Sequence, residues 1–453
     1  MSPRLMALVI AAVLVPGCGD DALPPRGPAV VTVVQDDAEM LHRTPERIGA
    51  TLDDLRSLGV DWIRITAQWR AIQPEAGVPP NWAPLDQAVR MAGERGLRVA
   101  LDIAFGPPEW ATLEGDFADY VTAVAERYPQ AVAFTVWNEP NHPVFLDPQW
   151  KRAEGGFVPA APHTYRAMLR EAVPRIRAAA PDALVLIGAT SSLGEERGTD
   201  PDDRMSPLRF VRELACVDAR LQPLDVADCR GDFAPLPGDG FSHHPYSGEL
   251  PPWESDTDDP GSVRLADLGR LRDLLDRLHA AGRIEEDLPL YLTEYGYQTN
   301  PPDPTWNVTP AEQARWLSEA EEIARAEPSV RSVAHFLHRD LPKRPGTTNP
   351  WGDFQTGLLY ESGEPKPAHE ALALPLVAHR VAAGRVRFWG LVRPGQGPAD
   401  ARVQAQRDGG WETLFAVRTD AEGVFERTVD TDPAATFRLV AGSRTGAPLA
   451  GAR

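Results

Sequence analysis

Residues 134–141 read Phe-Thr-Val-Trp-Asn-Glu-Pro-Asn, an apolar run that stops at an Asn-Glu pair followed by a proline. Strand-forming residues precede the pair, and the residues after it are polar and typical of a loop. The pattern predicts that Asn138 and Glu139 lie at the carboxyl end of a buried strand. Residues 290–296 repeat it, because Leu-Tyr-Leu-Thr-Glu-Tyr-Gly is again an apolar run that ends in a carboxylate, Glu294. Such strand ends form the functional site of many parallel α/β proteins.

Strand and helix signals alternate on both sides of these stretches. Eight such alternations over roughly 345 residues predict a parallel sheet closed into a (β/α)₈ barrel, the TIM barrel. After about residue 376 the pattern changes to short strands separated by turns that contain Gly, Asp or Pro, which predicts a small antiparallel β-sandwich. The expected domains are therefore a barrel over residues 29–376 and a β-sandwich over residues 383–453.

The N-terminal residues have the features of an export signal, with Arg4 followed by an apolar run over residues 5–15. A helix needs about 20 residues to span a bilayer, and this run is shorter. Residues 15–18, Val-Pro-Gly-Cys, also resemble a bacterial lipobox, in which Cys18 would carry the lipid, although Pro16 departs from the usual small or hydroxyl residue. We expect a signal over residues 1–18, a polar tether over residues 19–28, and export as a cell-envelope lipoprotein or as a secreted protein.

Composition excludes several other classes of protein. The formal net charge of −19 and the lack of any run of Lys or Arg argue against a nucleic-acid-binding protein. The apolar fraction of 43% and the charged fraction of 25% are those of a globular protein. Beyond Cys18 the sequence contains only Cys216 and Cys229, and a pair of cysteines in an exported protein favours a disulfide over a zinc site. The oligomeric state does not follow from the sequence.

Three motifs occur in a fixed order at the predicted strand ends. Trp-Asn-Glu-Pro at residues 137–140 ends strand four, His-Pro-Tyr at residues 244–246 follows strand six, and Thr-Glu-Tyr-Gly at residues 293–296 ends strand seven. This order resembles the clan of retaining (β/α)₈ glycoside hydrolases that includes cellulases, mannanases and β-xylosidases. The resemblance covers about residues 30–374 and not the terminal domain. It implies an enzyme whose substrate is a β-linked oligo- or polysaccharide.

The resemblance also implies a role for each motif residue. Glu139 would be the acid/base and Glu294 the nucleophile, because retention needs one carboxylic acid that protonates the leaving oxygen and one carboxylate that attacks the anomeric carbon. Asn138 would bind the 2-hydroxyl of the sugar. Tyr246 would donate to the nucleophile, and His244 would orient the sugar or tune the acid/base. No metal or organic cofactor is expected, since two carboxylates and water suffice.

Other candidate residues depend on which way a side chain faces. Arg64 lies within an apolar strand, matches the family's strand-two arginine that holds the nucleophile, and would need a carboxylate partner if buried; alternatively it points outward to a helix. His243 would line the site instead of His244 if the strand were shifted by one residue. Trp69 and Trp351 lie at predicted strand ends or in loops and are expected to stack on sugar rings, although a single tryptophan is more often part of a core.

The sequence departs from the family at strand eight, where a tryptophan often lies beneath the catalytic subsite. Residues 334–340 read Ala-His-Phe-Leu-His-Arg-Asp, so Trp351 or His338 would have to substitute, and the sugar is not specified. Two other functions remain open: a non-catalytic glycan-binding lipoprotein on a barrel scaffold, and a transglycosylase of the same mechanism. Turnover would exclude the first, and product analysis at high acceptor concentration would separate hydrolysis from transfer.

Overall fold

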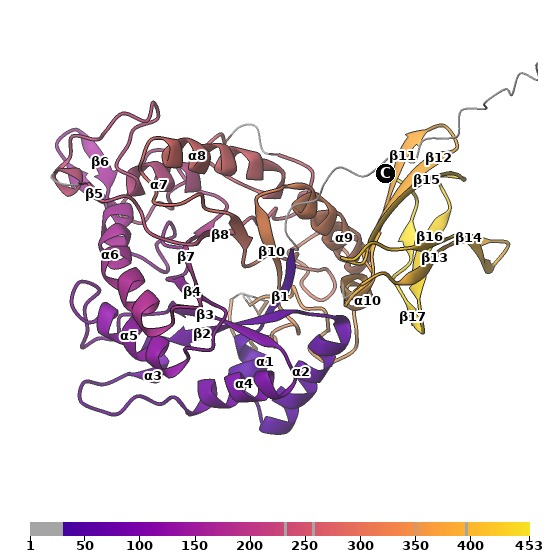
Figure 1. The fold of residues 1–453 in the computed structure, drawn as a ribbon, viewed down its shortest axis with the longest axis horizontal. Coiled ribbons are helices and arrows are strands. Elements are labelled where there is room, and N and C mark those ends of the chain that lie inside the picture. Colours follow the sequence, from indigo (N-terminus) through magenta and orange to yellow (C-terminus); the bar gives the residue numbers. More distant parts are fainter. Residues whose placement is uncertain (1–29, 231–232, 256–258, 349, 352, 395–396) are drawn as a thin grey trace, which may run out of the picture.

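The computed structural model describes residues 30–230, 233–255, 259–348, 350–351, 353–394 and 397–453. Its larger part is the predicted closed barrel of parallel strands, in the order β1-β10-β9-β8-β7-β4-β3-β2 (Figure 1). The barrel strands are β1 (Val31–Gln35), β2 (Trp62–Gln68), β3 (Arg98–Ala104), β4 (Ala133–Val136), β7 (Leu184–Ser191), β8 (Gly240–His244), β9 (Leu290–Leu292) and β10 (Val330–Phe336). The expected signal, the tether and Cys18 lie outside the described residues.

Helices surround the barrel in Figure 1, because a parallel sheet with apolar strands must be covered on its outer face. They are α1 (Asp37–Leu41), α2 (Pro45–Leu58), α3 (Trp69–Ile72), α4 (Ala83–Glu94), α5 (Phe117–Arg127), α6 (Ala161–Ala179), α7 (Pro207–Leu214), α8 (Leu268–Ala280), α9 (Pro310–Ala326) and α10 (Pro367–Ala373), with short 3₁₀ turns η1 (Ala227–Cys229) and η2 (Leu265–Asp267). Sequence signals explain several helix ends. The side chains of Thr44 and Thr309 cap α2 and α9 by accepting hydrogen bonds from backbone N–H groups of the first turn.

One hairpin in the barrel was not predicted. Strands β5 (Trp150–Ala153) and β6 (Gly156–Pro159) pair with each other between β4 and α6. Both strands are short and mostly exposed, so they lack the apolar alternation that identifies a half-buried strand. Glu154 and Gly155 form the turn, and Gly155 and the first residue of β6, Gly156, have φ angles of 91° and 143°, which glycine adopts without strain.

The C-terminal part contains antiparallel strands in two sheets, as predicted. One sheet has the order β11-β12-β15, and the other has the order β14-β13-β16-β17 with β18 paired to β16. Their bounds are β11 (Leu376–Ala382), β12 (Arg385–Leu391), β13 (Asp400–Arg407), β14 (Gly410–Arg418), β15 (Val424–Asp430), β16 (Thr436–Ala441), β17 (Arg444–Thr445) and β18 (Leu449–Ala450). Phe388 of the first sheet contacts Phe415 and Phe437 of the second, with ring centroids 5.5 and 4.9 Å apart, so the sheets pack face to face. Because β11 pairs along β12, these sheets begin before residue 383.

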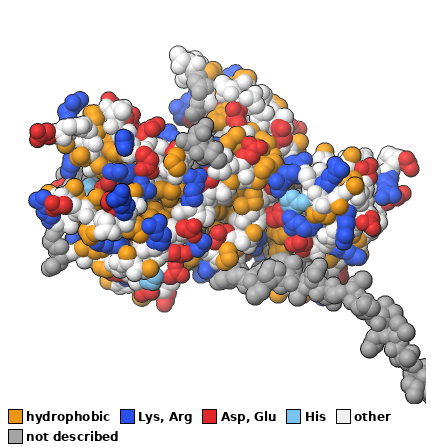
Figure 2. Space-filling view, turned by 90° about the horizontal axis from the view of Figure 1, so that it is seen from above, with side chains coloured by type: hydrophobic (Ala, Val, Ile, Leu, Met, Phe, Trp, Pro, Cys, Tyr) orange, Lys and Arg blue, Asp and Glu red, His pale blue; other side chains and the backbone are white. Residues whose placement is uncertain are grey.

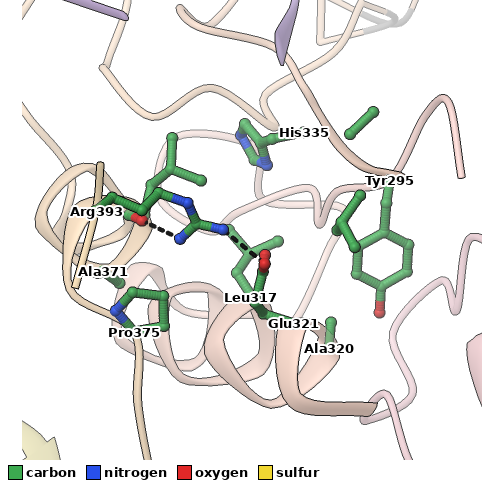
Figure 3. Close-up of a pocket in the computed structure, with 11 residues that line it drawn as sticks. Tyr295, Leu317, Ala320, Glu321, His335, Ala371, Pro375 and Arg393 are labelled. Atoms are coloured by element: carbon green, nitrogen blue, oxygen red, sulfur yellow. Dashed lines mark hydrogen bonds and ion pairs between the residues drawn. The ribbon is translucent and has the colours of Figure 1, made fainter. Parts of the chain in front are cut away.

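Helices α9 and α10 lie between the barrel and the C-terminal sheets in Figure 1. Arg393, which follows β12, is 5% exposed. Its guanidinium reaches the carboxylate of Glu321 in α9 at 2.6 Å and the hydroxyl of Thr32 in β1 at 2.8 Å. Figure 3 shows this ion pair beside a small cavity of about 20 Å³ that His335 of β10 also lines. The buried ion pair therefore links the two parts of the molecule.

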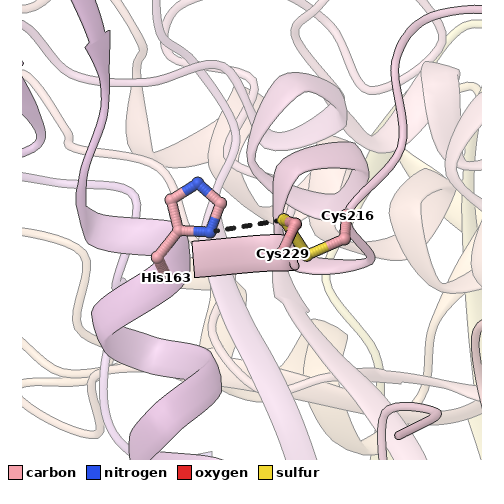
Figure 4. A group of neighbouring side chains, drawn as sticks. All are labelled: His163, Cys216 and Cys229. Atoms are coloured by element: carbon pink, nitrogen blue, oxygen red, sulfur yellow. Dashed lines mark hydrogen bonds between the residues drawn. A yellow bond between two sulfur atoms is a disulfide. The ribbon is translucent and has the colours of Figure 1, made fainter. Parts of the chain in front are cut away.

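Cys216 and Cys229 form a disulfide in the segment after α7 (Figure 4), which confirms the expected pair. His163 of α6 lies beside it, with Nδ1 4.0 Å from Sγ of Cys229. On the face shown in Figure 2, acidic and basic side chains are interspersed over the surface. Among the helices of the described residues, none combines the length and the apolar character needed to cross a membrane.

Candidate active site

The turn after β4 places Asn138 and Glu139 at the carboxyl end of the barrel. Backbone N–H groups hold this turn to the neighbouring strands, since Trp137 donates to the Ile103 carbonyl and Glu139 to the Ala189 carbonyl, each at 3.0 Å. Trp137 and Glu139 have φ angles of 69° and 38°, a left-handed conformation that costs free energy for residues with bulky side chains. The backbone is therefore strained where the predicted acid/base residue lies.

Glu294 lies two residues after β9, and two donors hold its carboxylate. Arg64 Nη1 donates to Oε1 at 2.7 Å, and the hydroxyl of Tyr246 donates to Oε2 at 3.1 Å. The Glu294 residue is 8% exposed and Arg64 only 1%. A guanidinium and a hydroxyl on the two oxygens stabilise negative charge on this carboxylate.

Arg64 connects side chains from several strands. Its guanidinium forms an ion pair with Asp102 of β3 at 3.1 Å, and it donates to the side-chain oxygens of Asn138, at 3.3 Å, and Gln35. Burial raises the pKa of Asp102 to about 7; the positive charge of Arg64 opposes this rise, and the charge of Glu294 adds to it. The Arg64 side chain therefore points into the barrel and not outward to a helix.

His244, the last residue of β8, lies between the two glutamates. Its Nδ1 is 2.9 Å from Oε1 of Glu139 and 3.6 Å from Oε2 of Glu294, and its Nε2 is 3.0 Å from the hydroxyl of Thr293. Burial raises the pKa of Glu139, but the hydrogen bond and positive charge of His244 outweigh burial, so this pKa lies below its ordinary value. His243 faces the other side of the strand, where its ring contacts a threonine hydroxyl and a backbone carbonyl. The strand register thus places His244, not His243, beside the carboxylates.

Carboxylate oxygens of Glu139 and Glu294 and a ring nitrogen of His244 all lie within 4.8 Å of one another. These are also ligand types for a metal ion, so the cluster has a second chemical interpretation. However, both nitrogens of His244 are engaged in hydrogen bonds, and the Glu294 oxygens are held by a guanidinium and a phenol. The side chains of His244 and Glu294 are thus satisfied within the protein, and the arrangement fits two-carboxylate chemistry.

The two tryptophans predicted to stack on sugar lie in different surroundings. Trp69 is 0% exposed and stacks on Tyr120 with ring centroids 5.2 Å apart. This corrects the expectation, because a ring packed within the core cannot contact a ligand. Trp351 is half-buried in the loop after β10, with a lysine ammonium 4.9 Å from its ring centroid. His338, the other substitute considered at strand eight, hydrogen-bonds Asp54 of α2 and so faces the helices.

Three further residues at this end of the barrel were not predicted. Gln35 ends β1 and Asp102 lies in β3, and both contact Arg64. Each is a polar residue in an apolar strand, which is the same signal that identified Arg64. Phe336 ends β10 opposite Gln35, and its ring meets that of Phe354 edge-on at 5.1 Å. Since Phe354 is 48% exposed, an exposed aromatic pair lies at the end of strand eight, where Trp351 or His338 had been considered.

A parallel barrel that carries two neighbouring carboxylates at the ends of its fourth and seventh strands has the arrangement expected of a (β/α)₈ glycoside hydrolase. The chain belongs to the cellulase family, glycosyl hydrolase family 5, whose family model matches residues 37–326. The protein is therefore a glycoside hydrolase with a carbohydrate substrate, and the resemblance inferred from the sequence is confirmed. No curated protein matches the chain.

Solved structures with the same fold share little sequence with this chain. A family 39 glycoside hydrolase from Bacteroides cellulosilyticus WH2 is 15% identical, with 88% of this chain and 80% of that chain covered and a TM-score of 0.53. A GH5_18 protein from Streptomyces cattleya in complex with GlcNAc is 18% identical, with 76% and 79% covered and a TM-score of 0.52. A GH5_18 protein from Bifidobacterium longum subsp. infantis is 15% identical, with 76% and 77% covered and a TM-score of 0.51. At these identities the likeness concerns the fold alone.

Proposed function

We propose that the protein is a retaining glycoside hydrolase of β-linked oligo- or polysaccharides, with Glu139 as acid/base and Glu294 as nucleophile. The observation that carries the proposal is the short distance between the two carboxylates, whose oxygens lie within 4.8 Å of each other. Carboxyl groups about 5 to 5.5 Å apart suit direct attack on the anomeric carbon, whereas an inverting pair stands about 6.5 to 9.5 Å apart to admit a water molecule.

The proposed reaction has two steps. In the first, a carboxylate oxygen of Glu294 bonds to the anomeric carbon while the bond to the leaving oxygen breaks, and Glu139 gives its proton to that oxygen. In the second, water attacks the anomeric carbon, Glu139 takes a proton from the water, and Glu294 is released as a carboxylate. Arg64 and Tyr246 orient the nucleophile throughout, because each holds one of its oxygens. The two displacements return the anomeric carbon to its original configuration.

Glu139 supplies the proton in this proposal, and His244 tunes its acidity. Burial raises the pKa of Glu139, but the hydrogen bond and charge of His244 outweigh burial, so this pKa lies below its ordinary value. The protonated carboxyl of Glu139 gives its proton to the leaving oxygen as negative charge develops on that oxygen. The hydroxyl of Thr293 on Nε2 fixes the ring of His244 in the required orientation.

Three groups at the carboxyl end of the barrel strands or in the loop after β10 are proposed to contact the sugar. The side-chain oxygen of Asn138 accepts from Arg64, which leaves its amide N–H groups to donate to a sugar hydroxyl. Phe336 and Phe354 offer an aromatic platform at the end of strand eight, because the apolar face of a sugar ring packs on aromatic side chains. Trp351 lies on the same loop as Phe354 and remains the tryptophan candidate for a sugar contact.

We also propose that the protein is exported. The disulfide between Cys216 and Cys229 supports this, because disulfides persist mainly in oxidising compartments. The N-terminal signal pattern predicts the same location, with lipid attachment at Cys18. Expression of the full chain in a bacterium followed by membrane fractionation tests the anchor: the wild type should sediment with membranes and Cys18→Ser should not.

Turnover of a panel of aryl β-glycosides and β-linked disaccharides, followed by proton NMR, tests the proposed reaction. The first product formed should keep the anomeric configuration of the substrate, and Glu294→Gln should remove activity. The panel should include Manβ1-4GlcNAc, which is bound in a solved structure of the Streptomyces cattleya GH5_18 protein that shares the fold (20% identity, TM-score 0.50). A first product of inverted configuration would show that the proposed mechanism is wrong.

A further inference from the structure

A pocket of about 280 Å³ opens beside the acid/base turn. It lies between the loop after β3 and the loop after β4, and residues 105–107 and 143–147 form most of its wall together with Arg70. Both loops leave the carboxyl end of the barrel, where the two carboxylates lie. The volume is close to the lower end of pockets that hold small ligands, about 300 to 1,000 Å³, and therefore suits a single sugar ring.

Phe105 in this pocket combines two unfavourable features. Its side chain is 40% exposed, and its φ of 57° is left-handed and strained for an aromatic residue. Neighbouring groups fix the loop in this conformation, since the Phe105 carbonyl accepts from the Arg70 N–H at 3.0 Å. Trp69 also packs so closely on Gly106 that a Cβ there would lie 2.3 Å from its ring. An exposed ring on a strained backbone does not favour folding, which points to contact with a ligand.

Phe105 is the outer member of an aromatic stripe, formed by His142, Phe145 and Phe105, that begins at the acid/base residue. The rings of Phe105 and Phe145 meet edge-on with centroids 5.6 Å apart, and those of Phe145 and His142 do so at 5.7 Å. The His142 backbone N–H donates to the Glu139 carbonyl at 2.9 Å, and the Trp137 indole donates to the Phe145 carbonyl at 3.1 Å. The stripe is therefore anchored to the turn that carries the acid/base.

We propose that this aromatic stripe binds the sugar on the leaving-group side of the cleaved bond, an inference that rests on the proposed function. Glu139 must reach the leaving oxygen, so the leaving sugar lies along the loop that carries Glu139 and not along Glu294. The apolar face of a pyranose packs on aromatic side chains. Arg70 and Asp147 add one charge of each sign to the pocket wall, and this balance favours a neutral sugar over an acidic one.

The test compares two substrates with the same glycone: a disaccharide, and a glycosyl fluoride whose leaving group has no sugar ring. Phe105→Ala should lower kcat/KM for the disaccharide about three- to tenfold, the range expected for loss of one aromatic contact, and that for the fluoride by less than about twofold. Phe105→Trp keeps an aromatic face and should retain most of the disaccharide activity. The control Val381→Ala removes an apolar side chain that is 52% exposed on β11, and it should leave both values unchanged.

Equal losses on both substrates, or no loss on the disaccharide, would overturn the inference while the proposed function stands. If the wild type cleaves neither substrate, both are overturned. Melting curves check that each variant is folded, and truncation of an exposed ring such as Phe105 should change the melting temperature little. Phe145→Ala is a second test, because it should produce the same selective loss on the disaccharide.

Discussion

Replacing His244 by glutamine should extend the activity of the enzyme to higher pH. In the wild-type site, burial raises the pKa of Glu139, but the hydrogen bond and charge of His244, 2.9 Å from Oε1, outweigh burial and lower it. Glutamine keeps an amide donor but carries no charge. The lowering effect of the His244 charge is therefore lost, the raising effect of burial remains, and the pKa of Glu139 rises. Because the acid must be protonated to assist the leaving oxygen, the pH at which activity is lost rises with it.

The size of the shift follows from the geometry of this contact. Two unit charges 2.9 Å apart interact by about 6 kcal/mol at an effective dielectric constant of about 20, which is an upper limit because desolvation opposes the attraction. The net contribution of a hydrogen bond to a charged group is about 1.5 to 3 kcal/mol, and about 1.4 kcal/mol corresponds to one pKa unit. The alkaline limb of the kcat/KM profile should therefore move upward by about one to two pH units.

Initial rates with an aryl β-glycoside across the pH range measure this limb. The matched control is His243→Gln. Burial lowers the pKa of His243 to about 4, so this ring is uncharged near neutral pH. The ring also contacts Thr190 and Val263 instead of Glu139. The control should lose activity at the same alkaline pH as the wild type. An unchanged limb in His244→Gln, or an equal shift in both variants, would refute the reasoning.

Three further predictions concern catalysis and stability. Glu139→Gln should lower kcat about 10²- to 10⁴-fold on disaccharides and far less on dinitrophenyl glycosides, whose leaving group needs no proton; equal losses would argue against an acid role. Arg393→Met removes one cation from the buried carboxylate of Glu321 and should lower the free energy of unfolding in urea by about 3 kcal/mol, whereas an unchanged value would show that the ion pair does not join the two parts. Burial lowers the pKa of His369, but hydrogen bonds to two carboxylates outweigh burial and raise it to about 9. A raised pKa stabilises the fold at pH values below the unfolded pKa of about 6.5, and this stability is lost as the pH rises through about 9. Urea unfolding across that interval should show the decline, and Asp54→Asn should remove it.

The barrel could be predicted because the same strand-helix signal recurs along the chain, and an error at one boundary does not change the number of repeats. The hairpin over residues 150–159 gave no such signal, since its strands are short and mostly exposed. Strand β11 fills the interval between the predicted barrel, which ends at residue 376, and the predicted β-sandwich, which begins at residue 383. Its partner β12 follows a tight turn at Gly384, which has a φ of 69°, and that glycine was the local signal for an additional hairpin.

The polar residues of the site could be predicted where they closely follow an apolar strand, as Asn138, Glu139 and Glu294 do, or interrupt one, as Arg64 does. The choice between the two adjacent histidines depended on strand register, and the register of β8 follows an irregularity between Gly188 and Thr190 of the neighbouring strand. A sequence pattern does not contain that information. The environment of Trp69 depends in the same way on packing against helix α5, which lies far along the chain.

The most direct test of the proposed mechanism is to trap the glycosyl-enzyme with a 2-deoxy-2-fluoro glycosyl fluoride of the best substrate and to locate the label by peptide mass spectrometry. A single sugar should be attached to the peptide that carries Glu294, and to the side chain of Glu294 within it. The label should be absent from Glu294→Gln. A label on any other residue, or a wild-type enzyme that turns over the substrate with inversion and takes up no label, would contradict the assignment of Glu294 as the nucleophile.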